Sequence, residues 1–270
     1  MSKLRRVLAL TLALILCMSM LTACGSGKKK KSGFRVLGEL NQEEFHVAFR
    51  ADDPLCDIVT AAMQELAAEG QLSRLCSQYL GVDHSCLEGK EFALTELRAT
   101  MDIPEGRFLR IGVQDGVAPL SSSRDDGSFA GLIPDLAKLV AEKLGWSFEY
   151  MVINSENVAA ELGSGNIDFA WMAASLSGNS GKYSLSPGWL KNTHELVVRN
   201  GSNISSKKSL KGKILGVTDS TSVDALKEDE LSDKIGAVWY YDSLTDCFNA
   251  LASGDCDALV IDSIVSRYYL

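Results

Sequence analysis

Along residues 34–270 the spacing of apolar residues alternates between the two-residue period of a strand and the three-to-four-residue period of a helix. Short apolar runs such as 108–113 and 258–261 predict strands, whereas the spaced apolar residues of 54–68 and 135–144 predict amphipathic helices. Because strands and helices alternate throughout, the sequence predicts an α/β fold in which helices pack on sheets.

The same spacing predicts the remaining elements. Further strands are expected at 34–38, 45–49, 147–153, 167–173, 195–199, 214–217 and 237–240, and further helices at 72–79, 92–101, 155–162, 222–227, 244–252 and 264–269. Asp126-Gly127 predicts the tight turn of a β-hairpin. Residues 82–106 are polar and rich in turn-forming residues, a composition that favours a linker.

The N-terminal residues have the pattern of a secretion signal. Lys3, Arg5 and Arg6 precede an apolar run, 7–21, that is shorter than the about 20 residues of a membrane-spanning helix. The run ends in Leu-Thr-Ala-Cys at 21–24, which is similar to the lipobox of bacterial lipoproteins. An ordinary secretion signal followed by a chance cysteine is the alternative.

The lipobox resemblance implies that residues 1–23 are a signal peptide and that Cys24 is diacylated after cleavage. Residues 24–33 contain four consecutive lysines and predict a flexible tether near anionic lipid headgroups. The expected location is the extracytoplasmic face of the cell membrane, with the protein attached by its lipid anchor.

Charge and composition narrow the function classes. The chain has a formal net charge of −8 although its N-terminus is basic, so the body is more acidic still. No basic stripe, and no basic residues interleaved with aromatic ones, suggests a nucleic-acid partner. After residue 21 no apolar stretch is long enough to span a bilayer. The sequence therefore predicts a globular body on a tether.

The cysteines leave two alternatives open. Five remain in the body once the signal peptide and the lipidated residue are set aside: Cys56, Cys76, Cys86, Cys247 and Cys256. Disulfides are possible outside the cytosol, with 76/86 and 247/256 as candidate pairs, or the thiols are buried and free. Zinc-like cysteine spacing is absent and the histidines are scattered, so the sequence predicts no metal and no cofactor.

Five segments carry a resemblance to one family of proteins. They are 45–81, 129–145, 162–168, 210–217 and 251–257. The segment 45–81 resembles the family's ending, and 129–145 resembles its first helix. The segments 162–168 and 251–257 resemble its paired L-x-x-G-x-x-D turns, and 210–217 resembles the strand that opens its second lobe. In cyclic order they resemble bacterial extracellular solute-binding proteins of the amino-acid-binding type (family 3), the receptors of ABC importers, over nearly all of the body.

This resemblance implies the type II periplasmic-binding-protein fold: two α/β lobes that are joined by two crossing strands, with a ligand cleft between the lobes. The family's ending stands near the N-terminus here, whereas its beginning resembles 107–150 and its middle runs to Leu270. The order of segments therefore implies a circular permutation.

The permutation implies a division of the body. Lobe one is expected at 40–195, with 82–106 linking the family's former termini. Lobe two is expected from 34–39 plus 196–270, and the hinge strands are expected near 38–42 and 195–200.

The resemblance also implies a ligand site. Asp262 follows the strand 258–261 and matches the family's acid that pairs with the ligand ammonium; such a strand end faces the crevice of an open sheet. Ser220, Thr221 and Ser222 match the helix start that holds the ligand carboxylate. Helix capping is the alternative for both places.

Two serines after the strand 167–173 complete the candidate site. Ser175 matches a ligand-contacting threonine of the family, with a plain loop serine as the alternative. Ser177 begins Ser-Gly-Asn-Ser, which replaces the family's Thr-x-Glu-Arg. The arginine that clamps the ligand carboxylate is therefore missing, and Val117 and Ile133 replace the family's aromatic ligand cover and its acid.

These features predict a lipid-anchored solute-binding protein, not an enzyme. It is expected to capture a small, polar, amino-acid-like solute and to present it to ABC permease subunits. A degenerate or sensory module of the same fold is the alternative, because the arginine is missing. A cyclohexadienyl dehydratase-like enzyme is a remote one, because no acid/base pair is evident at the cleft positions.

Overall fold

The computed structural model describes residues 33–172, 176 and 181–270. The signal peptide, Cys24 and most of the tether lie outside these residues, as do Ser175 and Ser177. In the part of the chain that is described, no helix has the length and apolar character needed to cross a membrane.

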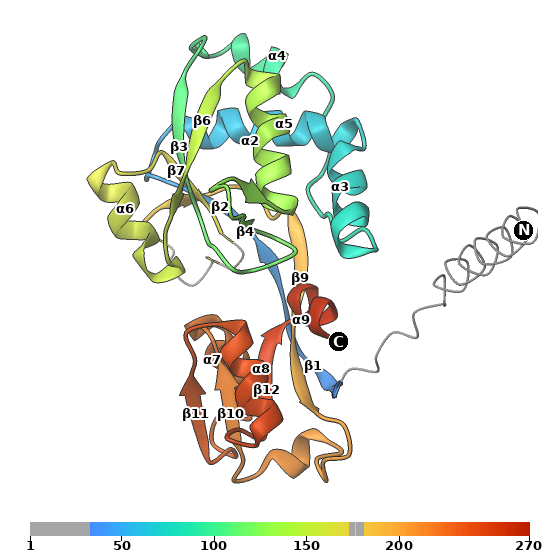
Figure 1. The fold of residues 1–270 in the computed structure, drawn as a ribbon. Coiled ribbons are helices and arrows are strands. Elements are labelled where there is room, and N and C mark those ends of the chain that lie inside the picture. Colours follow the sequence, from blue (N-terminus) through green and yellow to red (C-terminus); the bar gives the residue numbers. More distant parts are fainter. Residues whose placement is uncertain (1–32, 173–175, 177–180) are drawn as a thin grey trace, which may run out of the picture. The chain divides into compact units, whose positions relative to one another are not determined.

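Two five-stranded sheets organise the body (Figure 1). The first has the order β6 (Ser147–Val152), β3 (Phe108–Val113), β7 (Phe169–Trp171), β2 (Val47–Phe49) and β8 (Ser184–Leu185). The second has the order β1 (Phe34–Phe45), β9 (Leu190–Arg199), β12 (Ala258–Asp262), β10 (Ile214–Val217) and β11 (Ala237–Tyr240). A separate hairpin consists of β4 (Ser122–Ser123) and β5 (Phe129–Ala130).

Each sheet with its helices forms one lobe. The first lobe contains α2 (Leu55–Ala68), α3 (Gln71–Leu80), α4 (Ala93–Arg98), α5 (Leu132–Leu144), the 3-10 turn η2 (Ser155–Asn157) and α6 (Val158–Ser164). The second lobe contains the 3-10 turn η4 (Lys207–Leu210), α7 (Ser220–Glu228), α8 (Leu244–Ser253) and α9 (Ser263–Tyr269).

Helices cover both faces of each sheet because successive strand residues point to opposite faces. In the first lobe, Phe169 and Trp171 pack with α2 and α5, whereas Ala170 between them packs with α6. In the second lobe, Val197 belongs to the apolar cluster of α8 and α9, and Val198 belongs to that of α7. The continuous apolar runs of the sequence are therefore strands that are buried on both sides.

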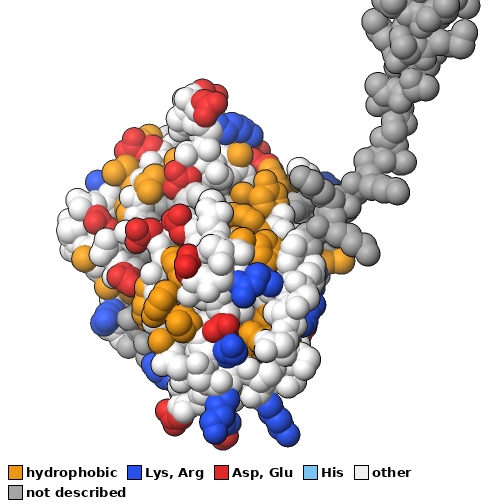
Figure 2. Space-filling model, turned by 60° about the horizontal axis from the view of Figure 1, so that its bottom comes forward, with side chains coloured by type: hydrophobic (Ala, Val, Ile, Leu, Met, Phe, Trp, Pro, Cys, Tyr) orange, Lys and Arg blue, Asp and Glu red, His pale blue; other side chains and the backbone are white. Residues whose placement is uncertain are grey.

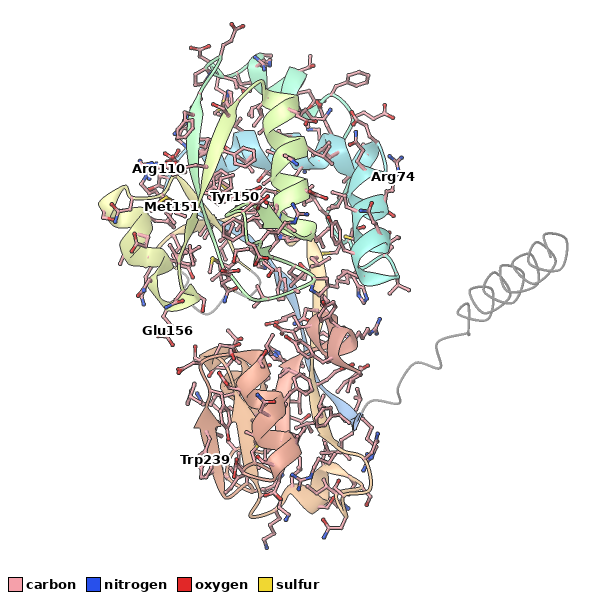
Figure 3. All side chains as sticks on the ribbon, viewed as in Figure 1. Arg74, Arg110, Tyr150, Met151, Glu156 and Trp239 are labelled. Atoms are coloured by element: carbon pink, nitrogen blue, oxygen red, sulfur yellow. The ribbon has the colours of Figure 1, made fainter. Side chains whose placement is uncertain are left out.

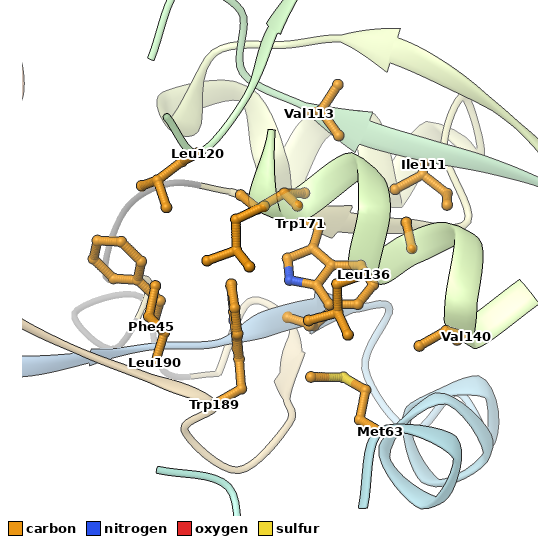
Figure 4. Close-up of a cluster of buried hydrophobic side chains, with 14 of the residues drawn as sticks. Phe45, Met63, Ile111, Val113, Leu120, Leu136, Val140, Trp171, Trp189 and Leu190 are labelled. Atoms are coloured by element: carbon orange, nitrogen blue, oxygen red, sulfur yellow. The ribbon is translucent and has the colours of Figure 1, made fainter. Parts of the chain in front are cut away.

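The core of the first lobe contains two tryptophans (Figure 4). Trp171 and Trp189 are completely buried, and their rings meet edge to face with centroids 5.8 Å apart. Their burial assigns both rings to packing rather than to the wall of a ligand cleft.

Two strands of the second sheet continue into the first lobe. β1 and β9 pair antiparallel from Phe34↔Arg199 to Phe45↔Leu190, and the chain then passes from β1 through His46 into β2. This ribbon links the two lobes in Figure 1. As the order of segments implied, 34–37 shares a sheet with 258–261, and 47–49, within the predicted strand 45–49, shares a sheet with 108–113.

The strands of the ribbon are longer than the sequence indicated. β1 extends to Phe45 and β9 begins at Leu190, because the polar residues of 39–44 are held by pairing with β9 rather than by apolar packing. β12 pairs with β9 as far as His194, so the second sheet extends slightly beyond the expected boundary at residue 196.

Most other elements lie within three residues of their predicted bounds. The predicted helix at 135–144 begins at Leu132, because Pro134 is tolerated in a first helical turn. The predicted helix at 92–101 is shortened to α4. All five described cysteines are free thiols. On the face drawn in Figure 2, Lys and Arg side chains are scattered among acidic and apolar ones.

Candidate functional site

A cleft of about 410 Å³ lies between the two lobes. The first lobe contributes the loop after β3, residues 114–117, and the segment 153–156 after β6. The second lobe contributes Thr218, Asp219, residues 240–244, Ile261, Asp262 and Val265. Figure 3 shows Glu156 at the end of the first lobe that faces the second.

The charge of this cleft is negative. Its acidic lining residues are Asp115, Glu156, Asp219, Asp242 and Asp262. Among the described residues that line it, none is a lysine, an arginine or a histidine. A cleft of this charge favours cationic groups and disfavours a free carboxylate.

The start of α7 is capped by Asp219. The Asp219 carboxylate accepts hydrogen bonds from the Ser222 backbone N–H at 2.9 Å and from the Thr221 hydroxyl at 2.7 Å. The helix N-terminus, which the sequence assigned to a ligand carboxylate, therefore already has a negative charge beside it. Ser220 is exposed and Ser222 is buried.

Thr221 lines a second, larger cavity of about 720 Å³. This cavity borders the ribbon through Asn41, Glu43 and Asn192, and it does not include Asp262. The sequence predicted that Asp262 and the start of α7 share one site. Thr218 and Asp219, which directly precede α7, line the cleft together with Asp262.

Asp262 belongs to a buried polar cluster between the two cavities. The Asn192 side-chain amide donates to Asp262 Oδ1 at 2.5 Å and to Glu43 Oε1 at 2.7 Å. The His194 ring stands beside both acids, with Nε2 3.5 Å from Asp262 Oδ1 and Nδ1 3.8 Å from Glu43 Oε1. The exposed fractions of the side chains are 16% for Asp262, 9% for Glu43 and 1% for His194.

Burial governs the protonation of this cluster. Desolvation, followed by the charge of Asp219, raises the pKa of Asp262 well above its ordinary range, and the hydrogen bond from Asn192 opposes this shift. Desolvation, followed by the charge of Asp262, raises the pKa of Glu43 in the same direction. The two acids are therefore poised to share a proton or to bind a cation.

The cluster also brings together three groups that ligate metals. One ligand atom each from Glu43, His194 and Asp262 lies within 4.8 Å of the other two. Glu43, Asn192 and His194 were not predicted from the sequence, because they lie far from Asp262 along the chain. Their closeness follows from strand register, since Glu43 pairs with Asn192 and His194 pairs with Asp262.

Among the solved structures with similar folds are several binding proteins. One is a substrate-binding protein of an ABC uptake transporter from Streptococcus pneumoniae with bound histidine, at 28% identity and a TM-score of 0.55, covering 60% of this chain and 69% of that one. Another is an ancestral arginine-binding protein bound to arginine, at 27% identity and a TM-score of 0.51, covering 62% and 74%.

A third similar structure is an ancestral amino-acid-binding protein described as a precursor of cyclohexadienyl dehydratase, at 26% identity and a TM-score of 0.54, covering 60% and 73%. No curated protein sequence matches the chain.

The two sheets, the linking ribbon and the cleft define a two-lobed type II periplasmic-binding-protein fold. Residues 109–242 match the model of the bacterial extracellular solute-binding proteins, family 3. This match confirms, over these residues, the resemblance to that family seen in the sequence.

Proposed function

We propose that the protein is a lipid-anchored, extracytoplasmic solute-binding protein that captures a small amine-bearing solute for an ABC importer. The observation that supports this most is the cleft between the lobes, which contains Asp262 and four other acids. Ligand contacts with both lobes would favour a closed state that the permease recognises.

The proposed ligand residues are Asp262, Ser220, Thr221 and Ser222, together with Ser175 and Ser177, which lie outside the described residues. Asp262 would pair with the ligand ammonium, as the resemblance implies. Asp219 at the start of α7 and the missing arginine at 177–180 both weaken binding of a ligand carboxylate. We therefore expect micromolar or weaker binding of ordinary α-amino acids and stronger binding of amines that bear less negative charge.

Titration calorimetry and thermal shift on the mature chain test this function. A solute at 100 times its dissociation constant should raise the free energy of unfolding by about 2.7 kcal/mol. Asp262→Asn should cost about 2–4 kcal/mol of binding, because it leaves a desolvated ammonium unpaired. Asp233→Asn is the matched control, because Asp233 is exposed and lines neither cavity.

The outcomes separate the candidate functions. Nanomolar binding of a common amino acid, or binding that is indifferent to Asp262, would contradict the assigned site. If no amine or amino acid stabilises the protein, a ligand-free scaffold is favoured. Such a scaffold is compatible with the structure, because Asp262 contacts Asn192 and Glu43 without a ligand. Turnover of prephenate would instead identify a dehydratase-like enzyme.

We further propose that the family fold is circularly permuted here, with lobe one at 40–195 and lobe two at 34–39 plus 196–270. Phe34 and Tyr269, near the two ends of the body, both contact the ring of Phe248, at centroid distances of 5.1 and 4.6 Å. Ends that lie so close can be joined without rearranging the fold.

A rearranged gene tests the permutation. It would join Leu270 to Phe34 through a short linker and open the chain within 82–106. We expect this chain to fold with a similar thermal midpoint and the same solute affinity. Failure of several such joints to give a folded protein would contradict the proposal.

The anchor is tested separately. Cys24→Ala should abolish lipidation and move the protein from the membrane fraction to a soluble one. Membrane retention of this variant, together with no acyl label on the wild type, would contradict the assignment.

A further inference from the structure

We propose that Glu43, His194 and Asp262 form a binding site for a divalent transition-metal ion, with Zn²⁺ as the best match. One imidazole nitrogen and two carboxylate oxygens are ligands that zinc accepts. The site would leave at least one coordination position open for water or for a solute. It goes beyond the proposed capture of an amine, and it involves His194, which lines neither cavity.

Hydrogen bonds fix the histidine tautomer. The Asn41 amide N–H donates to Glu228 Oε2 at 2.9 Å, so the Asn41 carbonyl oxygen is the atom that faces the ring. His194 Nδ1 lies 2.9 Å from this oxygen and therefore donates its proton to it. The lone pair of His194 is thereby placed on Nε2.

His194 Nε2 has no hydrogen-bond partner although the residue is only 1% exposed. It faces Asp262 Oδ1 at 3.5 Å. With this tautomer, the lone pair of His194 Nε2 faces a carboxylate oxygen in a buried place. A cation between them satisfies both atoms at once.

The distances suit a metal ion. Ligand atoms at zinc-bond lengths lie about 3.4 Å apart in a tetrahedral site. His194 Nε2 and Asp262 Oδ1 are already close to this spacing. Glu43 completes the group within 4.8 Å, and a small rotation of its side chain would bring its oxygen to coordination distance.

Surrounding groups hold the three ligands in place. Asn192 donates to both carboxylates, and its own carbonyl oxygen accepts from the Ser263 hydroxyl at 3.4 Å. Asn41 orients the imidazole from its far side. Metal ligands are typically oriented by such outer hydrogen bonds. Among the described residues, neither acid forms an ion pair with a lysine or an arginine.

Calorimetric titration of the mature chain with Zn²⁺, using Cys24→Ser to omit the lipid, tests the site. We expect one equivalent to bind. His194→Gln should weaken binding by about 100-fold or more, and Asn41→Ala by about 10-fold, because it removes only the orienting hydrogen bond. His46→Gln and His84→Gln are matched controls that should leave the affinity unchanged.

Co²⁺ provides the second readout. We expect visible d–d bands without a thiolate charge-transfer band, because the free cysteines are not part of the site. Absence of saturable Zn²⁺ binding by the wild type, or binding that survives His194→Gln or is lost when the thiols are alkylated, would overturn the proposal. Solute capture can fail or succeed independently, since the amine titration is run without metal.

Discussion

The two lobes contain the same turn in different surroundings. Comparing the two copies separates the geometry of the motif from its contribution to the free energy of unfolding. Asp168 and Asp257 end the L-x-x-G-x-x-D segments at 162–168 and 251–257. Each donates its backbone N–H to a strand carbonyl at 2.8 Å, that of Arg110 or that of Ile214. Each carboxylate accepts from the same residue's N–H, at 2.7 and 3.0 Å. The turn therefore fixes the helix–strand connection to a neighbouring strand in both lobes.

The surroundings of the two aspartates differ. Asp168 is 13% exposed in its side chain, and guanidinium groups of Arg50, Arg107 and Arg110 lie 3.6–3.8 Å away. Asp257 is 29% exposed and pairs with Lys213 at 3.2 Å. Identical motifs thus provide the same backbone hydrogen bonds in environments of different burial and charge.

Replacing each aspartate tests this comparison, and we expect these substitutions to change the free energy of unfolding most. Asp168→Ala should lower the free energy of unfolding by about 3 kcal/mol, and Asp257→Ala by about 1 kcal/mol. A buried donor left unsatisfied costs about 1–3 kcal/mol, and the cost falls as water reaches the group. Urea unfolding of the mature chain, followed by circular dichroism, measures the difference, with Asp233→Ala as the exposed control. Equal losses would mean that burial does not distinguish the two turns.

Elements with regular apolar patterns could be predicted from the sequence, whereas these two turns were recognised through the family resemblance. The runs at 108–113 and 258–261 became β3 and β12 because strands buried on both faces need apolar residues throughout. The apolar pattern did not predict a strand at 39–44, because this strand is defined by pairing with β9, a long-range interaction that leaves no local pattern. Only the family resemblance placed a hinge strand near 38–42.

The candidate site was only partly predictable for the same reason. Asp262 stands at the end of an apolar strand, a position that points to a crevice. Glu43, Asn192 and His194 join it only through the register of three strands. Asp219 could have been predicted as the cap of α7, since aspartate is a favoured N-cap residue. The family resemblance instead assigned the site to the residues that follow it, 220–222.

Replacing the glycines of the two turns should lower the free energy of unfolding by a smaller amount. Gly165 and Gly254 end α6 and α8 at φ +74° and +93°, a conformation that L residues rarely adopt. A Cβ at Gly165 would meet nothing within 4 Å, whereas one at Gly254 would lie 3.2 Å from Arg199 Nη1, which donates to the Leu251 carbonyl. Gly165→Ala should cost about 1 kcal/mol and Gly254→Ala about 2 kcal/mol. Thermal unfolding of both variants measures this order, and a reversed order would mean that Arg199 moves aside freely.

Replacing the cationic residues beside the two aspartates should change the free energy of unfolding least. Lys213→Gln should lower stability by about 0.5 kcal/mol, because exposed pairs contribute about 0.2–1 kcal/mol and Asp257 has no second cation among its described ion pairs. Arg110→Gln should cost less, because Arg50 and Arg107 remain beside Asp168. Urea unfolding in 0.1 M and in 1 M NaCl measures both losses, and the loss at Lys213 should shrink in high salt, which screens partly exposed charges. A larger loss at Arg110 than at Lys213 would show that the three arginines act as one network rather than as substitutes for one another.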